Sequence, residues 1–127
     1  MQAFDLVDTL VKISYKVYNT EQLVANIKNA DVIYRPKGNF IIITAQPDTP
    51  AVHTAISAMV NDNFPNCQRV VFVSGSEAQV AEKKASIIKR NGITDFTDNN
   101  RNILSKIKDL VPEVTLWVMT GSGRKKY

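Results

Sequence analysis

The sequence predicts one α/β domain built on a mostly parallel sheet. Short and almost continuously apolar runs at 40–45 and 70–73 are typical of strands that are covered on both faces. From residue 40 onward such runs alternate with helix-like segments, which favours right-handed βαβ units. These two observations predict a three-layer, Rossmann-like arrangement with helices on both faces of the sheet.

The size and composition fit a single folded domain over residues 1–127, with 44% hydrophobic and 22% charged residues. The one cysteine, Cys67, excludes an internal disulfide framework and a zinc site made of several cysteines. It suits a reducing compartment, so a cytoplasmic protein is expected. No long apolar segment or secretion leader is found, and we therefore expect no membrane span.

Residues 1–38 are predicted to hold a strand, a flap and a helix. A short apolar run at the start of the chain delivers Asp5 to a turn, where packing alone explains a carboxylate poorly. Alternating apolar and polar residues over 11–17 predict a half-buried ribbon, which we interpret as a flap within 11–20 over Asp5. Thr20 is expected to cap the helix that follows.

The rest of the chain is predicted to alternate between strands and helices. The expected strands are 40–45, 70–73, 93–97 and 114–119. The helices between them have recognisable end signals, which are Thr49 before Pro50, the capping-box pair Ser76 and Gln79, the terminator Gly92 and the caps at 98–100. The last segment, 121–127, is expected to be a frayed basic tail.

Polar side chains stand where the predicted strands end. Asp5 follows the first strand, Thr44 lies near the end of the strand at 40–45, and Asp98 and Asn99 follow the strand at 93–97. Ligands of open α/β sheets bind at the carboxyl ends of strands. These side chains are therefore candidates for a ligand site, with Asp95 as the alternative to Asp98 if the strand register differs.

Three stretches resemble motifs of the haloacid dehalogenase-like (HAD) superfamily. FDLVDTLV resembles the first motif, DxD(G/D)T(L/V), and IIITAQP resembles the second, a strand ending in Ser or Thr. KKASIIKRNGITDFTDNN resembles the third and fourth, a Lys followed by a helix, a Gly, a short strand and a carboxylate pair. The resemblance covers nearly the whole chain, and the short sequence between the motifs implies a minimal cap.

The resemblance implies a Mg²⁺-dependent hydrolase that acts through an aspartyl-phosphate. By matching position, Asp5 would be the nucleophile, and Thr44 and Lys84 would hold the phosphoryl oxygens. The spacing to Asp98 selects Lys84, with Lys83 as the alternative. A phosphorylated small molecule or a nucleic-acid end would be the substrate.

The resemblance also implies a metal site. Asp5, the carbonyl of Val7 and the side chain of Asp98 would hold the Mg²⁺ ion. The fourth motif often has two adjacent acids, and here either Asn99 or Thr97 fills the second place, depending on register.

Val7 is the departure from the first motif that matters most for the reaction. Phosphatases of the family have a second Asp at this place, which serves as a general acid and then as a general base. Loss of such a group typically costs ~10²–10⁴-fold in rate. A catalytically impaired binding or regulatory protein on the same fold is therefore the alternative to the enzyme.

The basic end of the chain suggests a third function. The net charge is +4, and Arg124, Lys125 and Lys126 stand close together near the carboxyl end. Such a patch suits anionic ligands, so a nucleic-acid-binding α/β module with steeply salt-dependent affinity is a further hypothesis.

Overall fold

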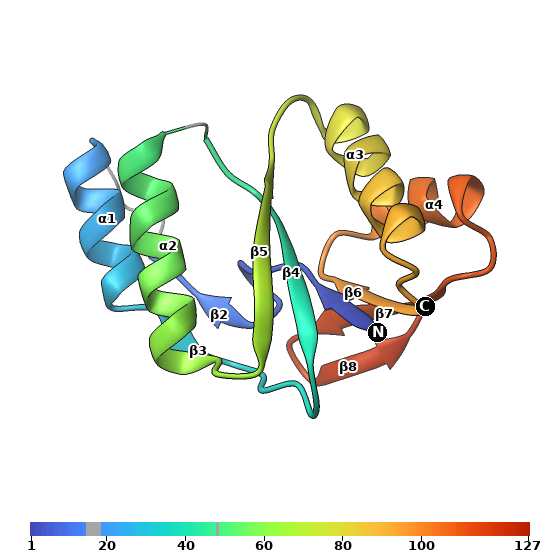
Figure 1. Ribbon diagram of the computed structural model, residues 1–127, viewed down its shortest axis with the longest axis horizontal. Coiled ribbons are helices and arrows are strands. Elements are labelled where there is room, and N and C mark those ends of the chain that lie inside the picture. Colours follow the sequence, from blue (N-terminus) through green and yellow to red (C-terminus); the bar gives the residue numbers. More distant parts are fainter. Residues whose placement is uncertain (15–18, 48) are drawn as a thin grey trace.

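The computed structural model describes residues 1–14, 19–47 and 49–127. Within these residues four helices flank a central sheet, and they are α1 (Thr20–Lys28), α2 (Pro50–Asn63), α3 (Glu77–Arg90) and α4 (Arg101–Leu110). Figure 1 shows α1 and α2 together on one face of this sheet and α3 and α4 together on the other. The predicted α/β class with helices on both faces is confirmed. None of the described helices has the length and apolar character needed to cross a membrane.

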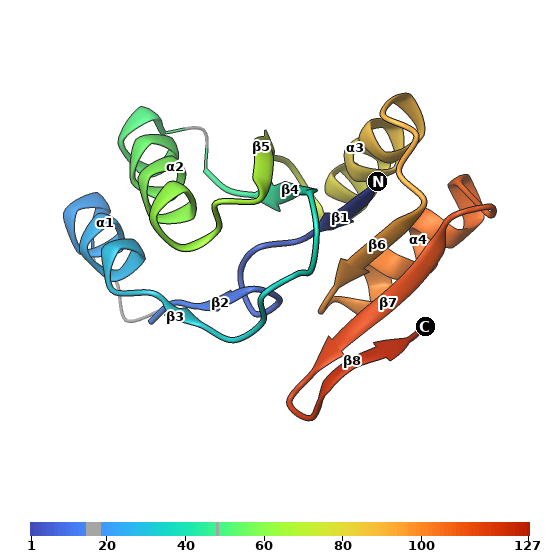
Figure 2. The same ribbon diagram turned by 60° about the horizontal axis from the view of Figure 1, so that its bottom comes forward.

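In the described part of the chain the central sheet has six strands, in the order β5 (Cys67–Val73), β4 (Phe40–Ala45), β1 (Gln2–Phe4), β6 (Asp95–Asp98), β7 (Thr115–Thr120) and β8 (Gly123–Lys126). The first five run parallel and β8 runs antiparallel to β7, as Figure 2 shows at the right. The chain first moves outward from β1 through β4 to β5, and then returns to the other side of β1 with β6. The direction of the strand order therefore reverses between β1 and β6, which is where sheets of this kind bind ligands.

The two faces of the sheet carry separate apolar clusters, and the alternation of side chains along β1 assigns residues to each. Ala3 packs in the cluster on the α3 and α4 face, whereas Phe4 packs in the cluster on the α1 and α2 face. Because successive side chains of a strand point to opposite faces, Asp5 follows Ala3 to the α3 side. The alternation of side chains along β1 thus directs the carboxylate of Asp5 toward α3.

A small ribbon lies beside the α1 and α2 cluster. It pairs β2 (Val11–Lys12) with β3 (Asp31–Val32) in antiparallel fashion. Of the ribbon expected at 11–17, Val11–Lys12 form a strand and residues 13–14 do not, while residues 15–18 of the expected flap lie outside the described residues. The cap of α1 is Asn19 rather than Thr20, because its side chain accepts the N–H of Gln22 at 2.9 Å.

The capping box predicted at the start of α3 is confirmed. The Ser76 hydroxyl accepts the N–H of Gln79, and the Gln79 side chain accepts the N–H of Ser76. This fixes the start of the helix, and its buried face then includes Lys84 between Ala81 and Ile88. A lysine on the apolar face of a helix needs a partner inside the protein, since burial of an unpaired charge is very costly.

The expected frayed tail at 121–127 is wrong for residues 123–126. These residues form β8, and the hairpin that joins it to β7 turns at residues 121–122, directly before Gly123, which has a φ of +110°. The guanidinium of Arg124 stacks over the Trp117 ring at 4.2 Å and donates from Nε to the hydroxyl of Thr97 at 3.1 Å. A cation–π contact and a hydrogen bond therefore hold a segment that its composition suggested would be loose.

Candidate functional site

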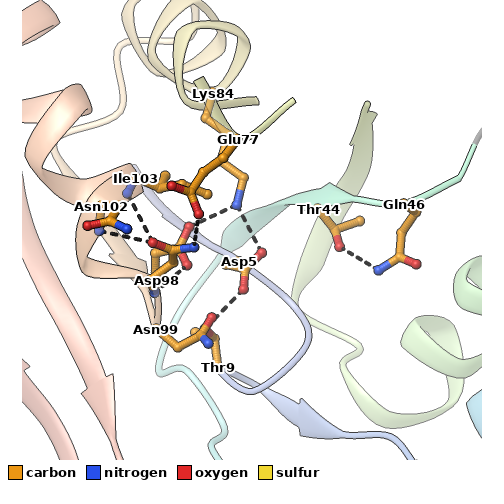
Figure 3. A network of polar contacts seen from close by, with 11 residues as sticks. Asp5, Thr9, Thr44, Gln46, Glu77, Lys84, Asp98, Asn99, Asn102 and Ile103 are labelled. Atoms are coloured by element: carbon orange, nitrogen blue, oxygen red, sulfur yellow. Dashed lines mark hydrogen bonds and ion pairs between the residues drawn. The ribbon is translucent and has the colours of Figure 1, made fainter. Parts of the chain in front are cut away.

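Two carboxylates and one ammonium group meet at the carboxyl ends of β1 and β6 (Figure 3). Lys84 Nζ lies 2.9 Å from Asp5 Oδ1 and 2.8 Å from Asp98 Oδ2. The three residues come from β1, α3 and β6, and they form the only ion pairs within residues 1–14, 19–47 and 49–127. The structure thus brings together three of the residues that the sequence singled out.

Strand register places the two acids side by side. Phe4 pairs with Thr97 across β1 and β6, so the residues that follow them, Asp5 just after β1 and Asp98 at the end of β6, lie at the same level of the sheet. The N–H of Asp5 donates to the carbonyl of Thr97 at 2.9 Å, which holds the backbone in this register. Asp98 Oδ1 accepts the N–H of Asn100 at 3.0 Å, which orients the second carboxylate at the start of α4.

Burial differs within the triad of Asp5, Lys84 and Asp98. The side chains of Lys84 and Asp98 are each 1% exposed, whereas that of Asp5 is 11% exposed. Asp5 is therefore the member of the triad that an incoming ligand can reach. Lys84 and Asp98 lie deeper in the fold than Asp5.

The environment of Asp5 raises its pKa from 3.8 to about 6. Burial is the main cause and the nearby charge of Asp98 adds to it, while Lys84 acts in the opposite direction. For Lys84, burial alone would lower the pKa, but the carboxylates of Asp5 and Asp98 outweigh it and raise the pKa. The ammonium group is thus protonated at all ordinary pH values, and Asp5 is ionised above about pH 6.

A tight turn after β1 adds a hydroxyl to the site. The carbonyl of Leu6 accepts the N–H groups of Thr9, Leu10 and Val11, and Asp8 has a φ of +62°. This left-handed conformation is one that Asp tolerates better than most residues. The turn folds the fully buried Thr9 back, so that its hydroxyl donates to Asp5 Oδ2 at 3.2 Å.

Thr9 was not singled out as a site residue in the sequence. Two signals could have found it, which are its place at the Thr of the motif DxD(G/D)T(L/V) and its spacing, four residues after Asp5 across a predicted turn. A turn of this length brings residue 9 back beside residue 5, so the hydroxyl of Thr9 can donate a hydrogen bond to the carboxylate of Asp5.

The amide of Asn99 faces both carboxylates. In one orientation its Nδ2 donates to Asp5 Oδ2 at 3.1 Å and to Asp98 Oδ1 at 3.2 Å. In the other orientation the amide oxygen occupies that place, and three oxygens then face one another. The orientation of an amide is assigned from its hydrogen-bond partners. The first orientation places N–H donors against the carboxylates and suits the protein alone, whereas the second places an oxygen there and suits a bound cation.

The donor set fits a hard divalent cation. Carboxylate and amide oxygens are the side-chain ligands that Mg²⁺ prefers, and Asp5, Asp98 and Asn99 supply them here. The set holds only two acids, and no group of three or more His, Cys, Asp or Glu side chains gathers among the described residues. Two carboxylates against the one ammonium of Lys84 leave an excess of one negative charge, which a cation would offset.

Two residues implied by the resemblance stand apart from the triad. Thr44 is buried near the end of β4, and its hydroxyl accepts a hydrogen bond from Gln46 Nε2 at 3.2 Å. Figure 3 shows this pair away from the triad. Val7 packs its side chain against the apolar cluster on the α1 and α2 face. Within the described residues the Thr44 hydroxyl makes no hydrogen bond to the triad, and the role that the resemblance implies for Val7 rests on its backbone carbonyl alone.

The alternatives left open by the sequence are resolved by geometry. Lys83 is exposed and donates to the carbonyl of Ser74 at 2.5 Å, so Lys84 is the lysine of the site. Asp95 lies at the opposite end of β6 and accepts the indole N–H of Trp117 at 3.2 Å. Asp98 is therefore the acid that joins Asp5.

Nothing matched this chain in comparisons with protein-family models, with curated proteins or with solved structures. Function is therefore inferred from the chemistry of the site.

Proposed function

We propose that this protein is a Mg²⁺-dependent hydrolase of the HAD-like type, which acts on phosphoesters through an aspartyl-phosphate. The observation that supports this most strongly is the convergence of Asp5, Lys84 and Asp98 from three separate elements at the carboxyl ends of β1 and β6. A gain in stability is a poor explanation for a buried ion pair, because the cost of desolvating its charges offsets much of the Coulomb energy between them. A partly exposed carboxylate in such a cluster is better explained by chemistry.

Asp5 is the proposed nucleophile. It is the most exposed member of the triad, and Lys84 and Thr9 each hold one of its oxygens. An Asp5 oxygen would attack phosphorus while the bond from phosphorus to the leaving oxygen breaks, and water would then release inorganic phosphate and restore the carboxylate. The ammonium of Lys84 would stabilise the charge on the phosphoryl oxygens, since it remains protonated throughout.

The proposed Mg²⁺ site consists of Asp5, Asp98 and Asn99, with the carbonyl of Val7 as a further ligand implied by the resemblance. The cation would offset the repulsion between the carboxylates and a phosphate. Without a cation the amide N–H groups of Asn99 take its place between the two carboxylates.

The side chain at Val7 limits the class of leaving group. A valine cannot give a proton to the departing oxygen or take one from water. Aryl and acyl phosphates release weakly basic oxyanions that need no proton, so these are the expected substrates. Alkyl phosphates are expected to react slowly.

The test is phosphate release from p-nitrophenyl phosphate and acetyl phosphate, with and without Mg²⁺. The parent protein is expected to show Mg²⁺-dependent turnover and Asp5→Asn is expected to lose it. Asp8→Asn is the matched control, since it removes a neighbouring carboxylate from the same turn and Asn also tolerates the left-handed backbone. Equal activity of the parent and Asp5→Asn would exclude Asp5 as the nucleophile.

A binding or regulatory protein on this fold is the second candidate, and the apolar packing of Val7 is the observation that favours it. It would bind Mg²⁺ and phosphate at the same residues without turnover. Mg²⁺ binding together with no phosphate release from either substrate would support this candidate over the enzyme.

A further inference from the structure

The edge strand β5 has an unpaired side that the proposed site does not use. It ends the sheet order, and within the described residues only β4 pairs with it. The carbonyl of Val73 accepts the N–H of Gln46, so Val73 directs its backbone groups toward the β4 side. Backbone direction alternates along a strand, and the N–H and C=O groups of Val70 and Phe72 therefore face the free edge.

A shallow groove runs along this edge between β5 and α3. Two adjoining hollows of about 580 and 400 Å³ make it up, and they share Val71, Phe72, Ile87 and Arg90 in their walls. Figure 1 shows β5 between α2 and α3 with no element drawn in front of it. The groove therefore offers an apolar floor next to a row of free backbone groups.

The charges around this groove have one sign. Arg69, Lys83 and Arg90 line it, all three are exposed, and no lining residue is acidic. None of the three forms an ion pair within the described part of the chain. Arg69 donates only to the amide oxygen of Asn91, at 2.8 Å, which leaves its charge uncompensated.

We propose that the β5 edge is a docking site for an acidic, extended peptide segment of a partner protein, which adds to the sheet as a further strand. Free backbone groups would give affinity. The three cations lie on the α3 face of this edge, whereas Val70 and Phe72 pack on the α1 and α2 face, so a strand in which acidic and apolar side chains alternate would match both faces. A second copy of this chain fits poorly, because pairing two β5 edges would bring Arg69 and Arg90 of both copies together.

The opposite edge of the sheet shows the contrast. β8 has only four residues, and its Lys125 and Lys126 are exposed, as is usual for an edge that avoids pairing. The free part of β5 instead carries four consecutive apolar residues, 70–73, with its cations at the margins. Charge at β8 protects the edge, whereas charge at β5 surrounds an apolar strand that is open to a partner.

The test uses fluorescein-labelled seven-residue peptides in which Glu alternates with Val, or Lys alternates with Val, and measures fluorescence anisotropy. The Glu peptide is expected to bind the parent at least about tenfold more tightly than the Lys peptide. Arg69→Glu combined with Arg90→Glu is expected to weaken binding by about tenfold or more. Lys125→Glu combined with Lys126→Glu makes the same change in net charge at the other edge and is expected to leave binding unchanged.

Strand addition is separated from simple charge attraction by N-methylation of the Glu peptide, either at its Val residues or at its Glu residues. A strand uses the N–H groups of alternate residues toward one neighbour, so one methylated peptide is expected to lose binding and the other to keep it. Equal binding of both methylated peptides would overturn the proposal. So would tighter binding of a single-stranded oligonucleotide at the same edge, or a dimer in sedimentation that the Arg69→Glu and Arg90→Glu changes dissolve.

Discussion

The carboxylates of Asp5 and Asp98 share one ammonium group, that of Lys84, at 2.9 and 2.8 Å. Each acid lies at the end of its own strand, and the shared cation lies on the helix that covers both. Within this cluster the charge of Asp98 raises the pKa of Asp5 and that of Lys84 lowers it, while the two carboxylates raise the pKa of Lys84. The first two predictions follow from this coupling.

Lys84→Met is expected to destabilise the fold by about 3–5 kcal/mol at pH 7.5, because it leaves two buried carboxylates without a cation. The loss should be smaller at pH 5, where a proton on one carboxylate removes most of the repulsion. Urea unfolding of the parent and the variant at both pH values measures this. Lys83→Met is the matched control, since Lys83 is exposed on the same helix, and it should change stability by less than about 0.5 kcal/mol. Equal losses of stability in Lys84→Met and Lys83→Met would show that the ammonium group of Lys84 does not stabilise the two carboxylates.

Asp5→Asn is expected to stabilise the protein at neutral pH. The pKa of Asp5 is about 6 in the fold against an ordinary 3.8, so the folded chain binds more protons than the unfolded chain between these values. Ionised Asp5 therefore lowers stability increasingly as the pH rises through this window, and fully above it. Asn removes the charge, so we expect a gain of about 1–3 kcal/mol at pH 7.5 in the absence of divalent cations, shrinking toward zero near pH 4.

Urea unfolding as a function of pH measures the gain. Glu82→Gln removes an exposed carboxylate from α3 and is expected to show no such pH dependence. A loss of stability in Asp5→Asn at pH 7.5 would mean that the contact with Lys84 outweighs the burial of the charge.

The order of the elements could be predicted from the sequence because each strand of the main sheet up to β7 carries a local signal. Phe40–Ala45 is apolar throughout, and the capping-box residues Ser76 and Gln79 mark the start of α3 without reference to any other part of the chain. The place of Asp5 and Asp98 followed from a rule on strand ends rather than from contacts. Local patterns of this kind are sufficient where burial on both faces dictates the residue type.

Other features could not be predicted because they depend on contacts between distant segments. Arg124 looks like a charge in a loose tail until Trp117 and Thr97 are brought beside it. The choice of Lys84 over Lys83 came from the spacing to Asp98, and the two carboxylates that surround the Lys84 ammonium group became visible only in the fold. The hydroxyl of Thr9 reaches Asp5 through a turn with positive φ at Asp8, which sequence pattern does not specify.

Mg²⁺ is expected to raise the melting temperature of the parent at pH 7.5 in a concentration-dependent way, because a ligand that binds only the folded state stabilises it. The effect should fall sharply at pH 5, where protons compete for Asp5, whose pKa is about 6 without the metal. Thermal unfolding over a Mg²⁺ series at both pH values measures this. An unchanged melting temperature at pH 7.5 would contradict the proposed cation site.

Asn99→Asp is expected to bind Mg²⁺ about tenfold more tightly than the parent and to be less stable without it. The substitution replaces an amide that can donate to both carboxylates with a third carboxylate beside them. The same thermal series measures both effects. Asn102→Asp adds an equal charge one residue inside α4 without replacing the amide that faces Asp5 and Asp98, and its Mg²⁺ response should match that of the parent. Equal responses of the two variants would exclude Asn99 from the site.

Val7→Asp is expected to raise turnover of glycerol phosphate by ~10²–10⁴-fold, because the new carboxyl group can protonate an alkoxide leaving group. The gain for p-nitrophenyl phosphate should be much smaller, since p-nitrophenolate leaves without a proton. Val7→Asn is the control, because it has a similar shape and polarity but no titratable proton. The ratio of rates on the two substrates is the deciding measurement, since a change in folding or in metal affinity would alter both rates together. Equal ratios in the two variants would mean that residue 7 does not face the leaving group, and the apolar packing of Val7 would then be its whole role.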